Sequence, residues 1–261
     1  MPVKLKGITL PSSLIYPKLD GFKLFDVMSQ VPVTDGLVGS YFLGSKNADP
    51  SYNFANPSLP LSVNLNPDFS DARFSVLSVL NGYFDTGITS TAQQTIISIA
   101  KMPKQTAAIV SNYLKDSSGG VSGDSILERI TSNKSLNTYA QSSSNAVTQA
   151  ERDNSSFNVD DFFVSGGVIT GAPSVGSWIM SETAAPAGTY INLPGRVVAS
   201  RTLRIGASYS STEFTADIGI SAVVIYNKDI GSDNITTVMN WLRNVVGVQA
   251  GIWNSPKILM M

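Results

Sequence analysis

The chain of 261 residues contains no cysteine and no histidine. Without cysteine it has neither disulfides nor thiolate ligands for zinc. Without histidine it lacks the imidazole of serine and cysteine protease triads and the most common general base. Any catalysis would have to use carboxylates, lysine or tyrosine, and we expect no catalytic residues.

Charge is also scarce. Charged residues make up 14% of the chain, against roughly 25% in an average globular protein. The net charge is −1 and no long basic run is present, so we expect no nucleic-acid partner, because phosphate binding needs clustered lysine and arginine. The hydrophobic content of 43% is ample for a packed core, and Ser, Thr, Asn and Gln must provide much of the surface.

Long apolar runs are missing as well. The first ten residues have no apolar core typical of a signal peptide, and no stretch reaches the roughly 20 apolar residues that a membrane span needs. We therefore expect a protein that neither inserts into a membrane nor is exported by its own sequence.

The two ends have their own character. Residues 1–35 carry prolines at a spacing that forbids a long helix or a central strand, so we expect an extended arm, packed on the domain or docked into a larger assembly. Residues 248–261 form a tail whose apolar end, 258–261, needs burial on this domain or across a subunit contact. A homo-oligomer is the expected state. The prolines of the arm are Pro2, Pro11, Pro17 and Pro32.

From residue 36 onward, short apolar runs alternate with Gly, Pro and Asn, which is typical of a β-sandwich or barrel. Two longer runs, 94–101 and 106–114, are joined through Pro103 and are predicted to form a hairpin. No internal repeat of fixed period is present, which disfavours a propeller or solenoid.

Residues 116–158 are the most polar part of the chain and are rich in serine. They are predicted to be either a solvated excursion with short strands, such as 125–130, or a binding loop. A helix over 144–152 is a weaker alternative because its apolar stripe is thin.

The clearest strand is 218–227, where Ile220, Ala222, Val224 and Tyr226 share one face, and it is predicted to lie in the centre of a sheet. A single amphipathic helix is predicted to follow over 232–246. Ser or Asp caps its first turn and glycine at 247 stops it.

Three segments resemble the concanavalin A-like (laminin G-like) lectin and glucanase superfamily. They are the strand and its continuation at 219–230, the upstream 203–206 run and the 82–87 run. The resemblance implies an all-β fold, a two-sheet antiparallel jelly-roll sandwich with one C-terminal amphipathic helix. The expected domain is 36–247, between the arm at 1–35 and the tail at 248–261.

This fold serves lectins, glycanases and adhesion modules alike. The acid-rich strand motif of the glycanases is absent, and the glutamates stand isolated at Glu128, Glu151, Glu182 and Glu213. The low charge, the missing Cys and His and the proline-punctuated arm resemble bacteriophage tail-fibre and other virion proteins.

The leading hypothesis is a non-catalytic carbohydrate-binding or receptor-recognising module of a phage virion. Its expected partners are cell-surface glycans or other virion subunits. One alternative is a purely structural capsid or tail decoration protein. The other is a glycan hydrolase that uses acids paired only in space.

Sugar binding needs flat apolar faces beside hydrogen-bonding groups, which Trp and Tyr combine. The candidate glycan-binding residues are Trp178, Tyr190, Asn192 and Tyr209. For each aromatic, a place in the core or at its rim is the alternative.

No cofactor is expected, apart from calcium as an open alternative. Asp85 and the pair Asp160 and Asp161 supply the oxygen ligands that this cation prefers. A solvated acid pair is the default interpretation, because no loop has dense acidic spacing. We predict no other metal site.

Overall fold

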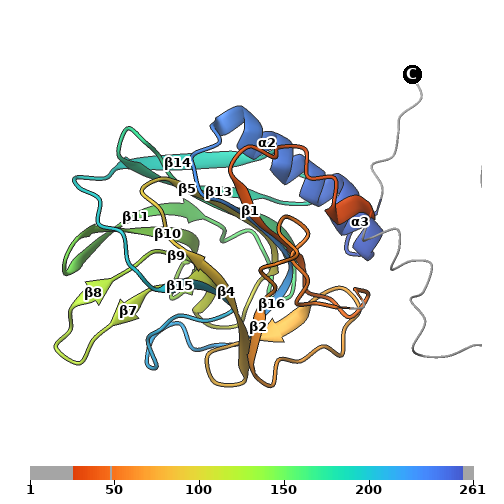
Figure 1. Ribbon diagram of the computed structural model, residues 1–261, viewed down its shortest axis with the longest axis horizontal. Helices are drawn as coiled ribbons and strands as arrows, with labels where there is room; N and C mark the ends of the chain where they lie inside the picture. Colours follow the sequence, from red (N-terminus) through yellow and green to blue (C-terminus); the bar gives the residue numbers. More distant parts are fainter. Residues whose placement is uncertain (1–25, 48, 255–261) are drawn as a thin grey trace, which may run out of the picture.

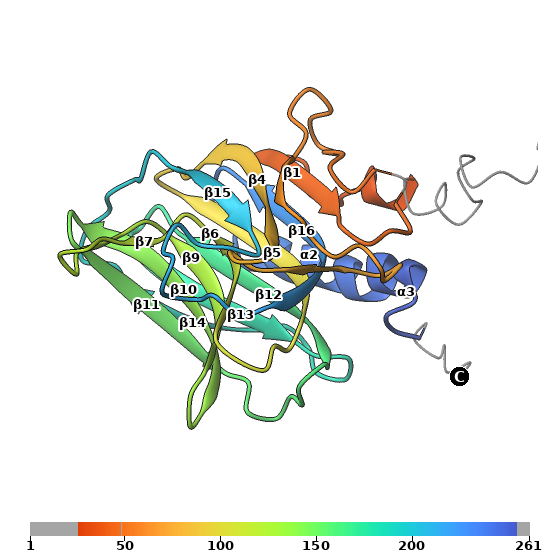
Figure 2. The same cartoon turned by 90° about the horizontal axis from the view of Figure 1, so that it is seen from below.

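The computed structural model describes residues 26–47 and 49–254 and shows two antiparallel β-sheets packed face to face, with one helix after the last strand (Figures 1 and 2). The predicted two-sheet sandwich is therefore confirmed. Sheet A has the order β1-β16-β5-β12-β13-β14 with β3 beside β16, and sheet B the order β11-β10-β9-β6-β15-β4-β2. A small third sheet pairs β7 with β8.

The strands have these bounds. Sheet A contains β1 (Leu37–Phe42), β3 (Ser75–Leu77), β5 (Gln94–Lys101), β12 (Phe162–Ile169), β13 (Ser174–Met180), β14 (Ala187–Asn192) and β16 (Ile218–Tyr226). Sheet B contains β2 (Ser62–Leu65), β4 (Gly82–Thr89), β6 (Ala107–Ser111), β9 (Ser125–Ile130), β10 (Lys134–Ser143), β11 (Ala146–Asp153) and β15 (Thr202–Ile205). The small sheet pairs β7 (Leu114–Lys115) with β8 (Val121–Ser122).

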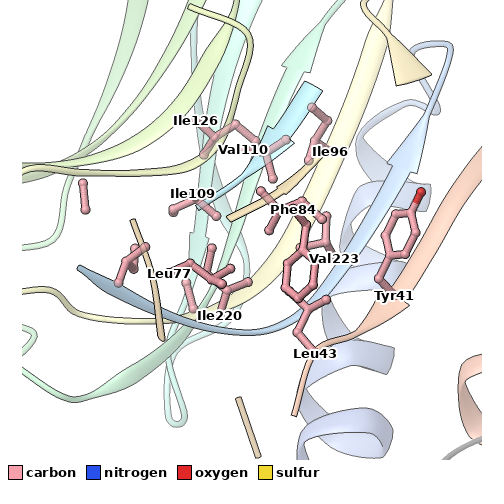
Figure 3. Close-up of a cluster of buried hydrophobic side chains, with 14 of the residues drawn as sticks. Tyr41, Leu43, Leu77, Phe84, Ile96, Ile109, Val110, Ile126, Ile220 and Val223 are labelled. Atoms are coloured by element: carbon pink, nitrogen blue, oxygen red, sulfur yellow. The ribbon is translucent and has the colours of Figure 1, made fainter. Parts of the chain in front are cut away.

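The main core lies between the two sheets (Figure 3). Ile96 and Val223 from sheet A meet Phe84 and Ile109 from sheet B, and all four are buried. Because successive strand residues point to opposite faces, each strand contributes every second side chain to this core.

Sheet A is also covered on its other face. This explains why every residue of β16, and every residue of β5 except Lys101, is buried. A second cluster joins Ile97, Val224 and Tyr226 to Ile235 and Val238 of the helix. The prediction that 218–227 lies inside a sheet is confirmed, since β16 lies between β5 on one side and β1 and β3 on the other.

The prediction that Ile220 shares one face of the strand with Ala222, Val224 and Tyr226 is wrong. The pairing register with β5 shifts between Ile220 and Ala222. A bulge of this kind reverses the alternation, so Ile220 packs between the sheets while Ala222 and Val224 face the helix.

The helix begins where predicted and ends later than predicted. It comprises α2 (Ser232–Trp241), a π-helical turn η1 (Leu242–Val246) and α3 (Gly247–Ala250). Gly231 is the N-cap residue and no side chain caps the first turn, so the predicted Ser or Asp cap is wrong. The stop is Gly251, at φ 82°, rather than Gly247. Among the residues that the structure describes, no helix is long and apolar enough to cross a membrane.

The predicted hairpin of 94–101 and 106–114 is wrong. β5 pairs with β12 and β16 in sheet A, whereas β6 pairs with β9 and β15 in sheet B. The link through Pro103 therefore crosses from one sheet to the other. Both strands are apolar on both faces, and this pattern fits two different layers as well as one hairpin.

Residues 116–158 are neither an excursion nor a helix. They contain β9, whose bounds match the predicted 125–130 run, and the long hairpin of β10 and β11. Several of their polar side chains are buried, and some of these bond a partner elsewhere in the chain: the Thr138 and Ser177 hydroxyls lie 2.8 Å apart between the sheets. Polar residues therefore occur inside strands here as well as in loops.

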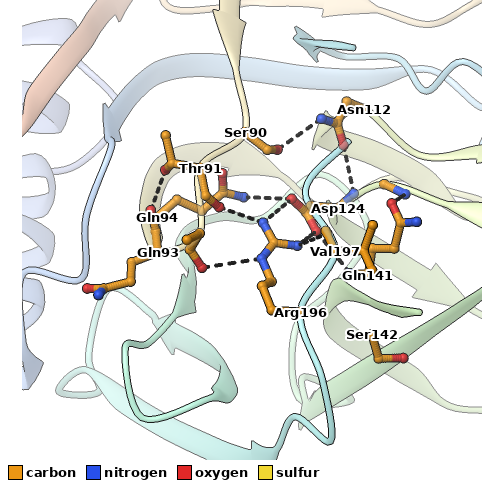
Figure 4. A network of polar contacts seen from close by, with 12 residues as sticks. Ser90, Thr91, Gln93, Gln94, Asn112, Asp124, Gln141, Ser142, Arg196 and Val197 are labelled. Atoms are coloured by element: carbon orange, nitrogen blue, oxygen red, sulfur yellow. Dashed lines mark hydrogen bonds and ion pairs between the residues drawn. The ribbon is translucent and has the colours of Figure 1, made fainter. Parts of the chain in front are cut away.

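A buried ion pair closes one part of the sandwich (Figure 4). Arg196 Nη1 and Nη2 lie 2.6 and 2.9 Å from the two carboxylate oxygens of Asp124, which is 2% exposed. Asp124 Oδ1 also accepts the backbone N–H of Gln141 at 3.0 Å. The ion pair therefore joins the segment before β15 to the start of β9, and the bond from Gln141 joins Asp124 to β10.

The predicted arm and tail fall largely on residues 1–25 and 255–261, which lie outside the described residues. Within the described parts, Met28, Val31 and Trp253 are buried in the cluster that lies between sheet A and the helix. The domain boundaries stay a prediction.

Candidate functional site

A cleft of about 460 Å³ opens where β3, the end of β5 and the segment before β16 meet. Its floor is apolar, since Phe74 and Met102 are buried and line it. Gly219 also lines it, and a Cβ there would lie 2.9 Å from Phe74 Cδ2 and 3.1 Å from Lys101 Cβ. The size and the apolar floor are typical of a small-ligand site.

One wall of the cleft carries a hydrogen-bonded amide and carboxylate. Asn81 Nδ2 donates to Asp217 Oδ1 at 2.8 Å, and both side chains are exposed. The remaining oxygens, Asn81 Oδ1 and Asp217 Oδ2, have no partner among the residues that the structure describes. This wall therefore offers acceptors, and a second amide N–H, to a ligand.

The other wall carries an ion pair. Lys101 Nζ lies 2.8 Å from Asp160 Oδ1 and 5.0 Å from the centroid of the Phe74 ring. The hydrogen bond from Lys101 lowers the pKa of Asp160, so this carboxylate stays ionised. Lys104, exposed at the rim, adds a second cation, and Leu80 at 65% exposure adds an apolar edge.

Three of the predicted glycan-binding residues lie together on β13 and β14, away from the cleft. Trp178 is only 8% exposed, and its Nε1 donates to the Tyr190 hydroxyl at 3.1 Å. A Cβ at Gly188 would lie 2.4 Å from Trp178 Cε2, so the indole ring packs directly on that glycine. Tyr190 is 40% exposed and Asn192 is exposed beside it on the edge strand.

The fourth predicted residue, Tyr209, lies in the loop after β15, against sheet B, and is not close to the other three. The Arg204 guanidinium carbon lies 3.4 Å from the centroid of the Tyr209 ring and 4.7 Å from that of Tyr83. The Tyr209 hydroxyl lies 2.8 Å from the Thr202 hydroxyl, which donates to Asp85 at 2.9 Å. We call Tyr83, Arg204 and Tyr209 the Arg204 stack.

The acids that were candidates for calcium are not gathered. Asp85 accepts bonds from Thr202 and from the Gly87 N–H, and Asp161 accepts the Asn158 N–H at 2.8 Å. No group of three or more Asp, Glu, His or Cys side chains suited to a metal occurs within residues 26–47 and 49–254. Calcium binding stays a prediction.

Of the residues that line the cleft, sequence reasoning singled out only Asp160, and as a candidate calcium ligand. Asn81 was visible only as part of an Asn-Gly turn signal, and Asp217 as an isolated acid 136 positions later in the chain. Nothing in the order of residues joins the two, because β3 and β16 become neighbours only when sheet A forms.

No protein-family model and no curated protein sequence matches this chain. Solved structures do resemble it. The binding domain of botulinum neurotoxin serotype D is 12% identical with a TM-score of 0.57, over 82% of this chain and 52% of that one. The receptor-binding domain of the C/D mosaic serotype is 12% identical with a TM-score of 0.55, over 80% and 52%.

A serotype D ligand-binding domain solved with N-acetylneuraminic acid is 14% identical, with a TM-score of 0.56 over 81% of this chain and 52% of its own. The chain thus spans about half the length of these structures. At such identities the likeness shows a shared fold.

Proposed function

We propose that the chain is a non-catalytic recognition module that binds a cell-surface carbohydrate in the cleft, as a component of a phage virion. The observation that carries this proposal is the Asn81 and Asp217 pair beside an apolar floor. A sugar ring presents C–H groups to an apolar surface and adjacent hydroxyls to an amide and a carboxylate. The cleft offers both kinds of group at one place.

The likeness to receptor-binding and ligand-binding domains of botulinum neurotoxins supports a recognition role at the level of the fold. The virion setting rests on composition: low charge, no Cys or His, and a proline-rich arm.

The cleft has polar groups suited to binding and a poor general acid. A glycosidase acid needs a raised pKa, whereas the pKa of Asp160 is lowered by Lys101. Burial raises the pKa of Glu128 to about 8. That carboxyl is fully buried between the sheets and does not line the cleft, so a ligand in the cleft does not reach it.

The test is glycan binding by wild-type protein and by Asp217→Ala on a printed glycan array, followed by titration of the best ligand. We expect the variant to lose at least about tenfold in affinity, since hydrogen bonds to a charged group contribute roughly 1.5–3 kcal/mol. The matched control is Asp233→Ala, which removes an exposed carboxylate from the first turn of α2. Absence of any wild-type binding, or equal binding by Asp217→Ala, would contradict the proposal.

A structural virion subunit is a second candidate, favoured by the edge strand β2. Val63 and Leu65 are 51% and 60% exposed there, at an edge that no strand of the described chain covers. Exposed apolar edge strands tend to pair with another chain. Analytical ultracentrifugation of wild type and Leu65→Lys tests this, and a wild-type protein that is monomeric at high concentration would contradict it.

A further inference from the structure

The Arg204 guanidinium is held by contacts with two aromatic rings and by a long ion pair with Asp85, at 3.8 Å. It lies between the rings of Tyr209 and Tyr83, at 3.4 and 4.7 Å from their centroids. Its side chain is 19% exposed, so part of it reaches solvent. Stacking holds the planar group rigid and leaves its in-plane N–H edge free for other partners.

That N–H edge is poorly used within the described chain. Nε is buried, has no hydrogen-bond partner and lies 3.8 Å from Asp85 Oδ2, so only the Nη1 and Nη2 end of the guanidinium remains for a ligand. Nη1 donates only to the Ser208 carbonyl, at 3.4 Å. By contrast, Arg196 bonds both oxygens of Asp124 through two nitrogens, at 2.6 and 2.9 Å.

Asp85 does not satisfy Arg204 because its oxygens have other donors. Oδ2 accepts the Thr202 hydroxyl at 2.9 Å and Oδ1 the Gly87 N–H at 3.0 Å. A second cation is close, since the Arg201 guanidinium carbon lies 5.6 Å from the Tyr209 centroid. The two arginines and one aspartate leave this surface with a local positive charge, which favours an anion.

The Arg204 stack adjoins the cleft along the chain. Asn81 of the cleft wall and Tyr83 of the stack are two positions apart, so their Cα atoms lie within about 7 Å. Asp217 and Tyr209 likewise belong to the one segment that joins β15 to β16. A chain of a few sugar units can therefore lie in the cleft and reach the stack.

We propose that the Arg204 stack binds the carboxylate of an acidic sugar, so that the glycan recognised by the cleft is one that carries uronic-type or sialic-type residues. The inference rests on the proposed carbohydrate function and names the class of its ligand. A guanidinium edge matches a carboxylate in geometry and charge, and the stack presents such an edge without a full internal partner.

The experiment compares wild-type protein, Arg204→Gln and Arg204→Lys on an array of matched glycan pairs that differ only in a carboxylate and its reduced, neutral form. We expect the wild type to prefer the acidic member at least about tenfold, as for one charge-assisted contact. Arg204→Gln should bind the two members equally. Arg204→Lys should retain an intermediate preference, because it keeps the charge but loses the planar fork.

Arg129→Gln is the matched control, since it removes the same charge from an exposed position on β9, and it should keep the wild-type preference. Circular dichroism of each variant checks the fold. A wild type that binds both members equally, or an Arg204→Gln variant that keeps the preference, overturns the inference while leaving the proposed function standing. A wild type that binds neither member overturns both.

Discussion

Glu128 is an acid in the core of the sandwich, and its burial makes a strong prediction about stability and pH. Its side chain is 0% exposed between the sheets, and Asn154 Nδ2 donates to its Oε2. Its Oε1 and the Asn154 Oδ1 have no hydrogen-bond partner. Desolvation by burial raises the pKa of Glu128 from 4.5 to about 8, and the Asn154 bond only partly offsets this rise.

The sign follows from which state holds the proton. Between pH 4.5 and about 8 the folded protein keeps a proton on Glu128 that the unfolded chain has released. The free energy of unfolding therefore falls as the pH rises through this range and levels off above it. At about 1.4 kcal/mol per pH unit, the loss by pH 7 is on the order of 3 kcal/mol.

The perturbation is Glu128→Gln, which keeps the shape and an acceptor for Asn154 but cannot ionise. We expect the variant to match the wild type near pH 5 and to exceed it by about 3 kcal/mol at pH 7, because the ionisation cost is gone. The new amide N–H also adds a hydrogen-bond donor beside Asn154, whose Oδ1 has no hydrogen-bond partner in the wild type.

The assay is urea unfolding at several pH values between about 5 and 8. No histidine titrates in this range, because the chain contains none. The carboxyls whose pKa is lowered, such as those of Asp71 and Asp160, titrate below it. Glu151→Gln, at an exposed position on β11, is the control and should keep the wild-type slope. A wild-type stability that is constant or rises with pH, or a Glu128→Gln slope equal to it, would refute the reasoning.

Three further substitutions probe the packing. Asp124→Ala should destabilise the fold by about 3–5 kcal/mol, because the charge of Arg196, whose side chain is only 12% exposed, would lose its partner, and urea unfolding measures this loss. Gly167→Ala should cost about 1–3 kcal/mol by overpacking, since its Cβ would lie 2.6 Å from an atom of the facing sheet; an unchanged melting temperature would contradict it. Gly247→Ala should displace Trp253, whose Cε3 would be 2.2 Å from the new Cβ, and shift its fluorescence to the red; an unshifted spectrum would show that the ring does not pack there.

The sequence predicted those parts of the fold that depend on local pattern. The buried run of β16 and the amphipathic helix after it follow from side-chain periodicity alone. The two-sheet architecture follows from many short apolar runs between Gly, Pro and Asn. The β5 and β6 hairpin failed because periodicity does not say which sheet a strand joins. The β10 and β11 hairpin was missed because its strands carry many polar residues, some of them bonded to partners far along the chain, as Thr138 is to Ser177.

The candidate site shows the same division. Tyr209 was predicted from its residue type, and the structure surrounds it with Arg204 and Tyr83. Trp178 was predicted on the same grounds and is mostly buried against Gly188. A residue type suggests what a side chain can bind, but its exposure depends on neighbours that the sequence does not reveal.

The sequence by itself determined the chemistry available: no thiol, no imidazole, few charges, and enough alternating apolar residues for two antiparallel layers. Only the tertiary structure decided where that chemistry lies. It brought Asn81 to Asp217, stacked Arg204 between two tyrosines and enclosed Glu128 in the core. The physical reason is that strand pairing joins segments more than a hundred residues apart, and local residue patterns carry no record of those partners.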